Sequence, residues 1–332
     1  MEKCCGSTSD ASAADVQRAR PIRREPVSTA IYTHEACFGH ETGTEHPESP
    51  ARLQAVLDAL DDPYFALLER IEAPRATRTQ LARVHRADLI ERILDHDAES
   101  FSELDPDTVV SPGSAEAALR AAGAVCAAVD DAITGWNRRA FCAVRPPGHH
   151  ATPSRAMGFC LFNNVAVGAA HAIARHRMQR VAIVDFDVHH GNGTQEIFWN
   201  DPRVLYVSLH EFPLYPGTGA AEEKGVGNMV NVPLPARCGS ASFRDAIEQT
   251  AMPALEAFGP QFLLVSAGFD AHRLDPLANL QLETDDFAWV TRRLADVANR
   301  HASGRLVSSL EGGYNLQALG ECAEAHVSAL MY

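Results

Sequence analysis

A group of carboxylates and imidazoles follows an apolar run near the middle of the chain. Residues 181–184 are all apolar, which is typical of a strand in a parallel sheet that is covered on both faces. Asp185, Asp187 and His189 come next at alternate positions, so their side chains point the same way while the chain stays extended. A carboxylate and an imidazole at this spacing are half of a divalent-metal site, and zinc accepts both ligand types. An isolated pair is more often a helix cap and a core histidine, but here two Asp, two His and two Gly fall within nine residues.

A third metal ligand is expected from Asp270, which follows the apolar run at 262–265. It would leave its strand at the same edge of the sheet, although an aspartate alone is more often a helix or turn cap. Two carboxylates and one imidazole leave positions on a zinc ion for a water and a substrate carbonyl oxygen. The ion would polarise the carbonyl and lower the pKa of the water.

Two adjacent histidines, His149 and His150, directly follow a rigid Pro-Pro-Gly turn that fixes where their rings point. They could ligate a metal, but imidazole is also the side chain best suited to move protons near neutral pH, and we favour that role. Such a pair needs acceptors that orient the rings, and Asp185 and Asn192 are available. An Asp partner favours the imidazolium form, whereas an Asn partner leaves the ring closer to neutral.

A tyrosine after a flexible glycine pair is the last candidate. Tyr314 follows Gly312 and Gly313, which allow the backbone to come close to a ligand. Its phenol could donate a hydrogen bond to an oxyanion that develops beside the metal. The alternative is a tyrosine buried in the core.

The elements that must position these residues alternate between strand and helix along most of the chain. This order predicts a single α/β domain with an open, mostly parallel β-sheet and helices on both faces. Ligands bind beyond the carboxyl ends of the strands in such sheets, and the clusters named above all follow predicted strands. Strands are expected at residues 30–32, 140–144, 181–184, 204–209, 262–265 and 306–310, and helices from Pro50 after an N-cap at Ser49 and at residues 81–95, 114–134, 164–175, 194–199, 243–258, 285–301 and 316–331.

Composition narrows the classes of function. The chain has 332 residues and a formal net charge of −14, so it is not built to attract nucleic acid through bulk charge. No apolar stretch reaches the roughly 18 residues of a membrane span, and the N-terminus lacks the apolar core of a signal peptide. The eight cysteines include no CxxC pair, which is typical of reduced thiols and predicts a cytoplasmic protein that binds no membrane.

The first residues differ in composition from the rest. Residues 1–27 are rich in Ser, Ala and Asp and then in Arg, and we expect them to form a flexible tail. The catalytic domain is then expected at residues 28–332, with no internal repeat or linker. Nothing in the composition opposes a homo-oligomer.

Seven short segments are collinear with the motifs of a known family. They are HPESPARL at 46–53, RPPGHHA at 145–151, GFCLFNN at 158–164, VDFDVHHGNGTQ at 184–195, YPGTG at 215–219, SAGFDAHRLDPL at 266–277 and LEGGYNL at 310–316. With these segments the chain resembles the histone deacetylase / acetoin-utilisation / acetylpolyamine amidohydrolase family, in its class II branch of bacterial-type histone deacetylase-like amidohydrolases. The resemblance covers nearly all of the chain except the tail, and seven collinear motifs are very specific.

The resemblance implies an arginase/deacetylase-like fold with one catalytic Zn²⁺ and one or two structural K⁺ ions. The zinc ligands would be Asp187, His189 and Asp270. The potassium ligands would be oxygen atoms that follow two of the strands: Asp185, Ser208 and the carbonyl groups of Asp187, His189 and Leu209 for the first ion, and the surroundings of Phe198, Asp201 and Val204 for a second.

The resemblance also assigns the catalytic roles in the hydrolysis of an acetamide. His150 would be the general base on the water, paired with Asn192, where class I enzymes usually carry Asp. Asp185 would orient His149. Tyr314 matches the tyrosine that stabilises the transition state and is not the His of the weakly active class IIa enzymes, so an active hydrolase is implied.

The expected substrate is the acyl-lysine of a protein or peptide. Gly158, Phe159 and Tyr215 resemble the wall of the acyl-lysine tunnel, with Tyr where Phe is usual. Leu277 sits where acyl-lysine deacetylases carry a hydrophobic gatekeeper and the eukaryotic polyamine deacetylase carries Glu, so a small acetylated amine is the second choice. A rim carboxylate that grips a peptide backbone is expected from Asp105 or Asp107.

Three other functions remain open at this point. An acetylpolyamine or other small-amide hydrolase would share every catalytic residue. A silent acyl-lysine binding protein would not need His149, His150 and Tyr314, and a manganese hydrolase of the arginase type would need more Asp ligands for two metals. Arg52 corresponds to the family's arginine at an internal channel below the zinc.

Overall fold

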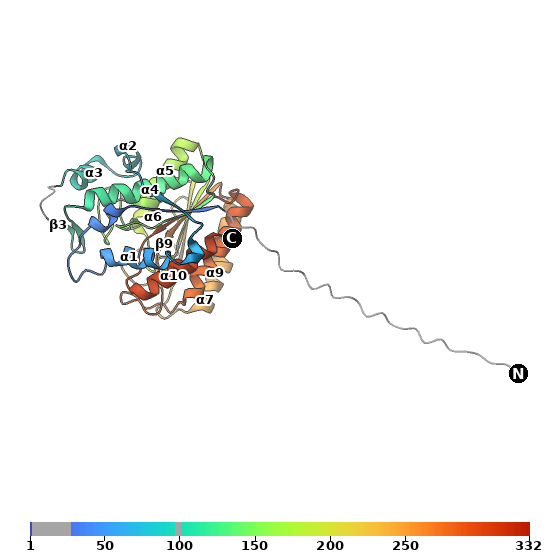
Figure 1. The fold of residues 1–332 in the computed structure, drawn as a ribbon. Helices are drawn as coiled ribbons and strands as arrows, with labels where there is room; N and C mark the ends of the chain where they lie inside the picture. Colours follow the sequence, from blue (N-terminus) through green and yellow to red (C-terminus); the bar gives the residue numbers. More distant parts are fainter. Residues whose placement is uncertain (2–27, 97–100) are drawn as a thin grey trace.

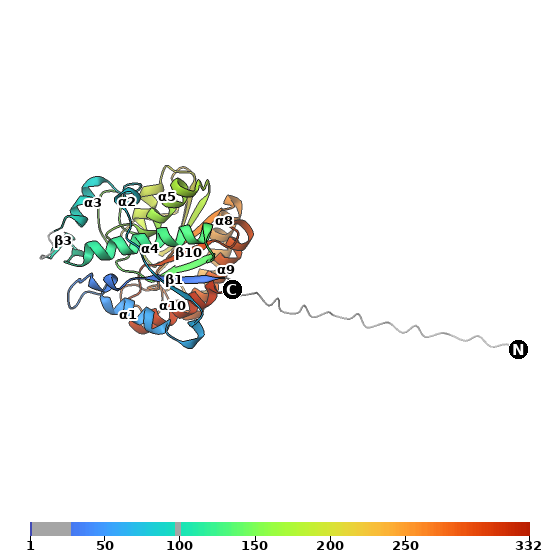
Figure 2. The same cartoon turned by 45° about the horizontal axis from the view of Figure 1, so that its top comes forward.

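The computed structural model describes residue 1, residues 28–96 and residues 101–332. Apart from its first residue, the tail expected at 1–27 therefore lies outside the described residues. The described chain builds an eight-stranded sheet in which all neighbouring strands run parallel (Figures 1 and 2). From one edge to the other, its strands are β2 (Glu69–Glu72), β1 (Thr29–Thr33), β5 (Arg139–Cys142), β10 (Leu306–Leu310), β9 (Phe262–Ala267), β6 (Val181–Asp185), β7 (Val204–Glu211) and β8 (Met229–Leu234).

Helices cover both faces of this sheet (Figure 1). On one face α4 (Ser114–Thr134) packs against α5 (Asn164–His176). On the other face α1 (Pro50–Ala59) and α9 (Thr284–His301) pack against α10 (Leu316–Leu330). The predicted α/β fold with an open parallel sheet is confirmed.

Short elements fill the connections. The edge strands β2 and β8 are the two strands of the main sheet that the sequence did not predict. The remaining elements are the antiparallel pair β3 (Ser102–Asp105) and β4 (Thr108–Val110), the helices α2 (Arg78–Leu81), α3 (Ala87–Leu94), α6 (Asn192–Phe198), α7 (Ser240–Ala246) and α8 (Met252–Phe258), the 3₁₀ turns Glu35–Gly39 and Pro63–Phe65, and a π turn at Ile247–Ala251.

The single helix expected at 81–95 is wrong, because the chain forms α2 and α3 with a break between them. In the break, His85 Nδ1 lies 3.0 Å from the carbonyl oxygen of Thr152, and His85 Nε2 accepts the N–H of Asn163 at 2.9 Å. The N–H of Arg86 donates to the same distant loop at 2.8 Å. These tertiary bonds replace the bonds between residues four apart that a continuous helix would make.

Two further details differ from expectation. Helix 243–258 is interrupted by the π turn between α7 and α8. Ser49 precedes α1 as expected, but its side chain makes no capping hydrogen bond. Pro50 begins the helix, where its missing N–H is not needed.

The central strands are buried along their whole length. This holds for β5, β6, β9 and β10, whose apolar runs fit a sheet with helices on both faces. Because the strands are parallel, their carboxyl ends lie at one edge of the sheet, and the loops that follow them meet there. Among the described residues, no helix is both long and apolar enough to cross a membrane.

Candidate active site

Three side chains expected to bind a metal lie together at the carboxyl ends of β6 and β9. His189 Nδ1 is 3.2 Å from Asp187 Oδ1 and 3.1 Å from Asp270 Oδ2. The backbone fixes both carboxylates, since the N–H of Val188 donates to Asp270 Oδ1 at 2.9 Å and the N–H of Gly312 donates to Asp187 Oδ2 at 2.8 Å. One imidazole and two carboxylates at one point are a donor set that suits zinc.

Two glycines make room for these carboxylates. A Cβ atom at Gly268 would overlap with Asp187 Oδ2, and a Cβ atom at Gly312 would overlap with Asp270 Oδ2. The loops after β9 and β10 therefore approach the carboxylates so closely that a side chain would displace them. The ligand atoms of the three residues lie within 4.8 Å of one another.

The charges of the three groups also fit a divalent cation. Burial disfavours the imidazolium of His189, but its hydrogen bonds to Asp187 and Asp270 outweigh burial and raise its pKa to about 10. Burial, and then the charge of Asp187, raise the pKa of Asp270 to about 7. Burial also opposes ionisation of Asp187, yet the positive charge of His149 and the hydrogen bond from His189 hold its pKa well below the usual range. A divalent cation would pair with both carboxylates and displace the proton that His189 otherwise carries.

The tandem histidines each face a different acceptor. His149 Nδ1 lies 3.0 Å from Asp185 Oδ2, and His150 Nδ1 lies 2.8 Å from Asn192 Oδ1. The amide nitrogen of Asn192 is directed at the sulfur of Met157 at 3.5 Å, which sets the orientation of the amide. Because an amide oxygen only accepts, His150 carries its proton at Nδ1, and its Nε2 is free to accept another.

The two rings differ in charge. Burial disfavours the imidazolium of His149, but the charges of Asp185 and Asp187 outweigh burial and raise its pKa to about 10. Burial, and then the positive charges of His149 and His189, hold the pKa of His150 well below its usual value. The pair therefore combines a charged ring with a neutral one.

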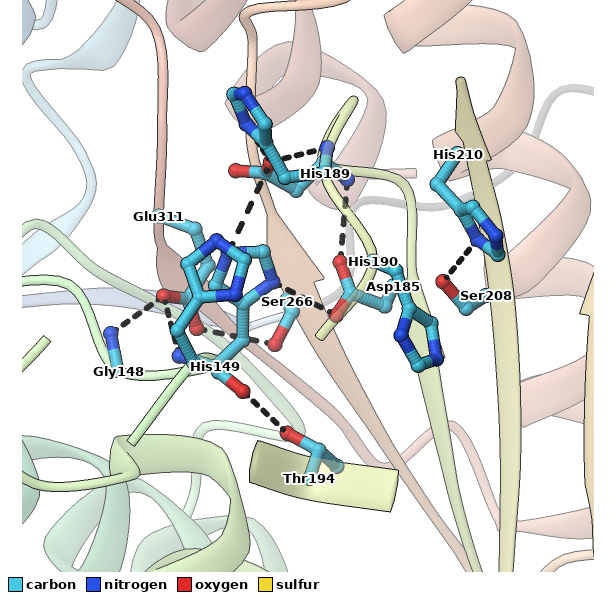
Figure 3. A network of polar contacts seen from close by, with 12 residues as sticks. Gly148, His149, Asp185, His189, His190, Thr194, Ser208, His210, Ser266 and Glu311 are labelled. Carbon is cyan, nitrogen blue, oxygen red and sulfur yellow. Dashed lines mark hydrogen bonds and ion pairs between the residues drawn. The ribbon is translucent and has the colours of Figure 1, made fainter. Parts of the chain in front are cut away.

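A buried glutamate that the sequence did not single out holds the histidine loop. Glu311 accepts the N–H of Gly148 at 2.6 Å, the N–H of His149 at 3.1 Å and the hydroxyl of Ser266 at 3.0 Å. Figure 3 shows His149 between Glu311 and Asp185. Burial raises the pKa of Glu311 to about 7. The LEGGYNL segment contains this residue, but only the fold shows that it reaches a loop far away in the sequence.

A cavity of about 190 Å³ borders His150 and His189. A Cβ atom at Gly158 would overlap with the ring of His150, and φ is +56° at this residue, so glycine is required there. Asp105, one of two expected rim carboxylates, is not part of the lining. The other lining residues are Asp107, Gly158, Phe159, Tyr215, Leu277 and Tyr314, which include all four expected substrate-binding residues.

Two charged residues hold the backbone at Tyr314. The guanidinium carbon of Arg52 lies 4.8 Å from the centre of the Tyr314 ring, and Arg52 Nε donates to the carbonyl oxygen of Gly313 at 2.6 Å. Asp275 accepts the N–H of Tyr314 at 2.7 Å with one oxygen and the N–H of Leu277 at 3.0 Å with the other. One carboxylate thus joins the rim of the cavity to its tyrosine. Burial raises the pKa of Tyr314 well above its usual value, so the hydroxyl keeps its proton.

Arg52 belongs to a fully buried ion cluster that the sequence did not reveal. Glu48 pairs with Arg52 at 3.1 Å and accepts from Arg145 Nη2 at 2.7 Å. Burial opposes ionisation of Glu48, but the charge of Arg145 outweighs it and lowers its pKa to about 2. The segments HPESPARL and RPPGHHA contain these residues, but the sequence does not show that the two segments contact each other.

The first set of expected potassium ligands lies beside the histidine pair. Asp185 and Ser208 are register partners on β6 and β7, and both are fully buried. The Ser208 hydroxyl lies 2.8 Å from Nδ1 of His210 (Figure 3). Leu209, which would offer its carbonyl group, is also buried.

The second set of expected ligands surrounds a side chain. The carbonyl oxygens of Phe198, Asp201 and Val204 lie 2.9, 3.0 and 2.9 Å from one atom, Nδ2 of Asn228. This amide nitrogen donates to all three oxygens.

A second group of metal-binding side chain types lies between α4 and α5. His171 Nε2 and His176 Nε2 are 2.8 and 2.5 Å from Asp130 Oδ1. Arg83 Nη1 donates to His171 Nδ1 at 2.8 Å, so the proton of the His171 ring must be on Nε2. Nε2 then donates a hydrogen bond to Asp130. Hydrogen bonds therefore account for this group.

Comparison with known proteins identifies the family of the chain. The sequence profile described as the histone deacetylase domain matches residues 46–330. The chain is 42% identical over 302 residues to the histone deacetylase-like amidohydrolase of Pseudomonas aeruginosa, covering 89% of this chain and 78% of that protein. It is 39% identical over 296 residues to a probable deacetylase of Archaeoglobus fulgidus, covering 87% and 82%. The crystal structure of the HDA15 HD domain superposes with a TM-score of 0.86 at 38% identity, over 92% of this chain and 88% of that one. The chain therefore belongs to the histone deacetylase family, a family of deacetylases.

Proposed function

We propose that the protein is a zinc-dependent hydrolase of the class II type that removes acetyl or related acyl groups from the ε-amino group of lysine. The observation that carries this proposal is one cavity lined by His150, Tyr314 and His189, where His189 lies together with two carboxylates that could hold a metal with it. Zinc held by Asp187, His189 and Asp270 would polarise the amide carbonyl and lower the pKa of a water molecule.

His150 is the base in this proposal. His150 lines the cavity and its Nδ1 proton is engaged with Asn192, so Nε2 remains as the acceptor that takes the proton of the attacking water. His149 holds its positive charge beside Asp185. The proton taken up by the histidine pair then passes to the leaving nitrogen, and with the second proton of the water the products are an ammonium group and a carboxylate.

Tyr314 completes the proposed site from the opposite loop. Its hydroxyl keeps its proton and can donate a hydrogen bond to the oxyanion that forms on the substrate. Arg52 and Asp275 keep the backbone of Tyr314 in place, so the hydroxyl does not need to be ordered during the reaction.

The lining suits an apolar substrate chain that ends in an amide. Phe159 and Tyr215 present aromatic rings, and Leu277 presents an apolar side chain. These surfaces suit the methylene groups of an acyl-lysine, whose buried apolar area favours binding.

An acetylated polyamine is a second candidate, and one observation favours it. Asp107 places a carboxylate in the lining of the cavity. Its negative charge could attract the further ammonium groups of a polyamine as well as the backbone N–H of a peptide.

We also propose one structural K⁺ ion at Asp185 and Ser208, completed by the carbonyl groups of Asp187, His189 and Leu209. The support is a fully buried carboxylate and a fully buried hydroxyl at adjoining strand positions.

The test is the kcat/KM of the zinc-loaded protein on an acetyl-lysine peptide, N8-acetylspermidine and acetylputrescine, with His150→Ala as the blank. We expect the peptide to be the best substrate and a chelator to abolish its turnover. A polyamine preference would keep the mechanism and overturn the substrate. Turnover of none of the three, with acyl-lysine peptide still bound, would leave a binding protein.

A further inference from the structure

The place expected for a second K⁺ ion lies between the end of α6 and the start of β7. Three carbonyl groups converge there, from Phe198 at the end of the helix, Asp201 in the connection and Val204 at the start of the strand. Carbonyl oxygens gathered in this way are the ligands that K⁺ takes in channel filters.

An amide nitrogen already lies at the point where these carbonyl groups converge. Asn228, which directly precedes β8, sends Nδ2 to within 2.9–3.0 Å of all three oxygens. An ion could not share this place with the amide. The cation would be coordinated by the same oxygens that accept hydrogen bonds from the amide nitrogen. The residues therefore do not fit a second ion while Asn228 keeps this conformation.

The orientation of the Asn228 amide is fixed from its other side. Its Oδ1 accepts the N–H of Val226 at 3.1 Å, so exchanging the amide's nitrogen and oxygen would set an N–H against an N–H. The side chain is buried, and a Cβ atom at Gly225 would come within 2.7 Å of its Oδ1 and of the carbonyl oxygen of Trp199. This turn is therefore packed tightly around the amide.

Two of the three oxygens are also used within the turn itself. The carbonyl oxygen of Phe198 accepts the N–H of Asp201 at 3.0 Å, and that of Asp201 accepts the N–H of Val204 at 3.1 Å. An amide nitrogen has two hydrogens for three acceptors, so one bond is shared, and these turn bonds reduce what each oxygen still needs. A covalently attached donor also loses no translational freedom, unlike a free ion.

We propose that Asn228 takes the place of the second monovalent cation, so that this protein binds K⁺ at the Asp185–Ser208 site and not at the carbonyl groups of Phe198, Asp201 and Val204. To admit an ion, Asn228 would have to leave the three carbonyl groups, which takes these partners away from a buried amide. The inference uses the fold alone and does not depend on the proposed activity.

The test uses Tl⁺ as an anomalous-scattering substitute for K⁺. Crystals of the zinc-loaded protein are grown with Tl⁺ replacing K⁺, and anomalous peaks are located for the wild type, Asn228→Ala and a control, Asn231→Ala. The control removes another buried asparagine of the same stretch, whose amide nitrogen donates to Gln195 at 2.7 Å and not to the three carbonyl groups.

We expect no peak among the three carbonyl groups in the wild type or in Asn231→Ala, and a new peak there in Asn228→Ala. In solution, with choline balancing the ionic strength, the Tm of Asn228→Ala should then depend more strongly on K⁺ than the Tm of the wild type, because the variant has a second site in addition to the Asp185–Ser208 site. A wild-type peak among the carbonyl groups would overturn the proposal, and so would a folded Asn228→Ala without one. If Asn228→Ala does not fold, the wild-type crystal alone decides.

Discussion

Tyr314 is held in place through its backbone, so its hydroxyl can be removed without disturbing its position. The N–H of Tyr314 donates to Asp275, and the ring lies against Arg52. Losing one donor to an oxyanion typically reduces turnover by about 100- to 1,000-fold. We therefore expect Tyr314→Phe to lose about this much kcat, with little change in KM or Tm, because the hydrogen bond is made only in the transition state.

The measurement is steady-state kinetics on the best substrate together with a thermal melt and a zinc analysis. Tyr64→Phe, which removes a hydroxyl from a half-exposed tyrosine on the surface, is the matched control. If Tyr314→Phe turns over at the wild-type rate with full zinc, Tyr314 has no part in the chemistry.

The candidate metal ligands and catalytic residues could be predicted from sequence. The residues that fix the loops around them could not. Asp187 and His189 are close in sequence, and their spacing shows in the printed chain. Glu311 and Asp275 act through N–H groups of distant loops, and backbone donors leave no trace in residue type. Asn228 was missed for a related reason, because its partners are backbone carbonyl groups, which residue type does not reveal either.

At the scale of elements, α4 shows how close packing overrules helix propensity. A Cβ atom at Gly123, in the middle of this helix, would overlap with the carbonyl oxygen of Pro74. Ala76 in the same crossing segment donates its N–H to the carbonyl oxygen of Leu119 at 2.8 Å, which fixes the segment against the helix. Gly→Ala in an open helix stabilises by about 1 kcal/mol, but here we expect Gly123→Ala to destabilise by about 1–3 kcal/mol through overpacking.

Chemical denaturation measures this difference in the free energy of unfolding. Gly320→Ala in α10 is the control, because its nearest new neighbour, the carbonyl oxygen of Ala55, would be 3.2 Å away. Its change should be smaller than that of Gly123→Ala. A Gly123→Ala protein as stable as the wild type would show that the crossing segment yields without cost.

The elements predicted best were those that are buried on all sides. Apolar runs identified the six inner strands, whose pattern needs no knowledge of the neighbours. The edge strand β2 reads Glu-Arg-Ile-Glu and is mostly exposed, so it carries no such run. The break between α2 and α3 depends on bonds from His85 and Arg86 to a loop after the tandem histidines, and a helical period continues through it.

For the whole molecule, buried neutral histidines make stability depend on pH. Burial lowers the pKa of His85 to about 4 and that of His326 to about 3, from a usual value of 6.5. As the pH falls below 6.5, these rings become protonated in the unfolded chain. In the folded protein they stay neutral until about pH 4. The free energy of unfolding therefore decreases as the pH falls, by roughly 1–2 kcal/mol per histidine between pH 7 and pH 5.

Urea unfolding at pH 7 and pH 5 tests this for the wild type and for His326→Gln. We expect the difference between the two pH values to be smaller in His326→Gln, because glutamine takes up no proton. His34→Gln, at a partly exposed position, is the control. Any loss of metal at pH 5 is common to all three proteins and cancels in the comparison. Equal differences in wild type and His326→Gln would contradict the argument.

The strand order has a consequence for how the chain is made. β5 and β6 are separated in the sheet by β10 and β9, which are synthesised later. Until those two strands emerge, the chain can pair only β2-β1-β5 and β6-β7-β8, two partial sheets that each present an open apolar edge. Unpaired strand edges can pair with other chains, so the nascent chain must be protected from aggregation until its central strands are added to the sheet. Asp270 arrives with β9, and a metal ion can therefore lock the finished sheet but cannot guide its early assembly.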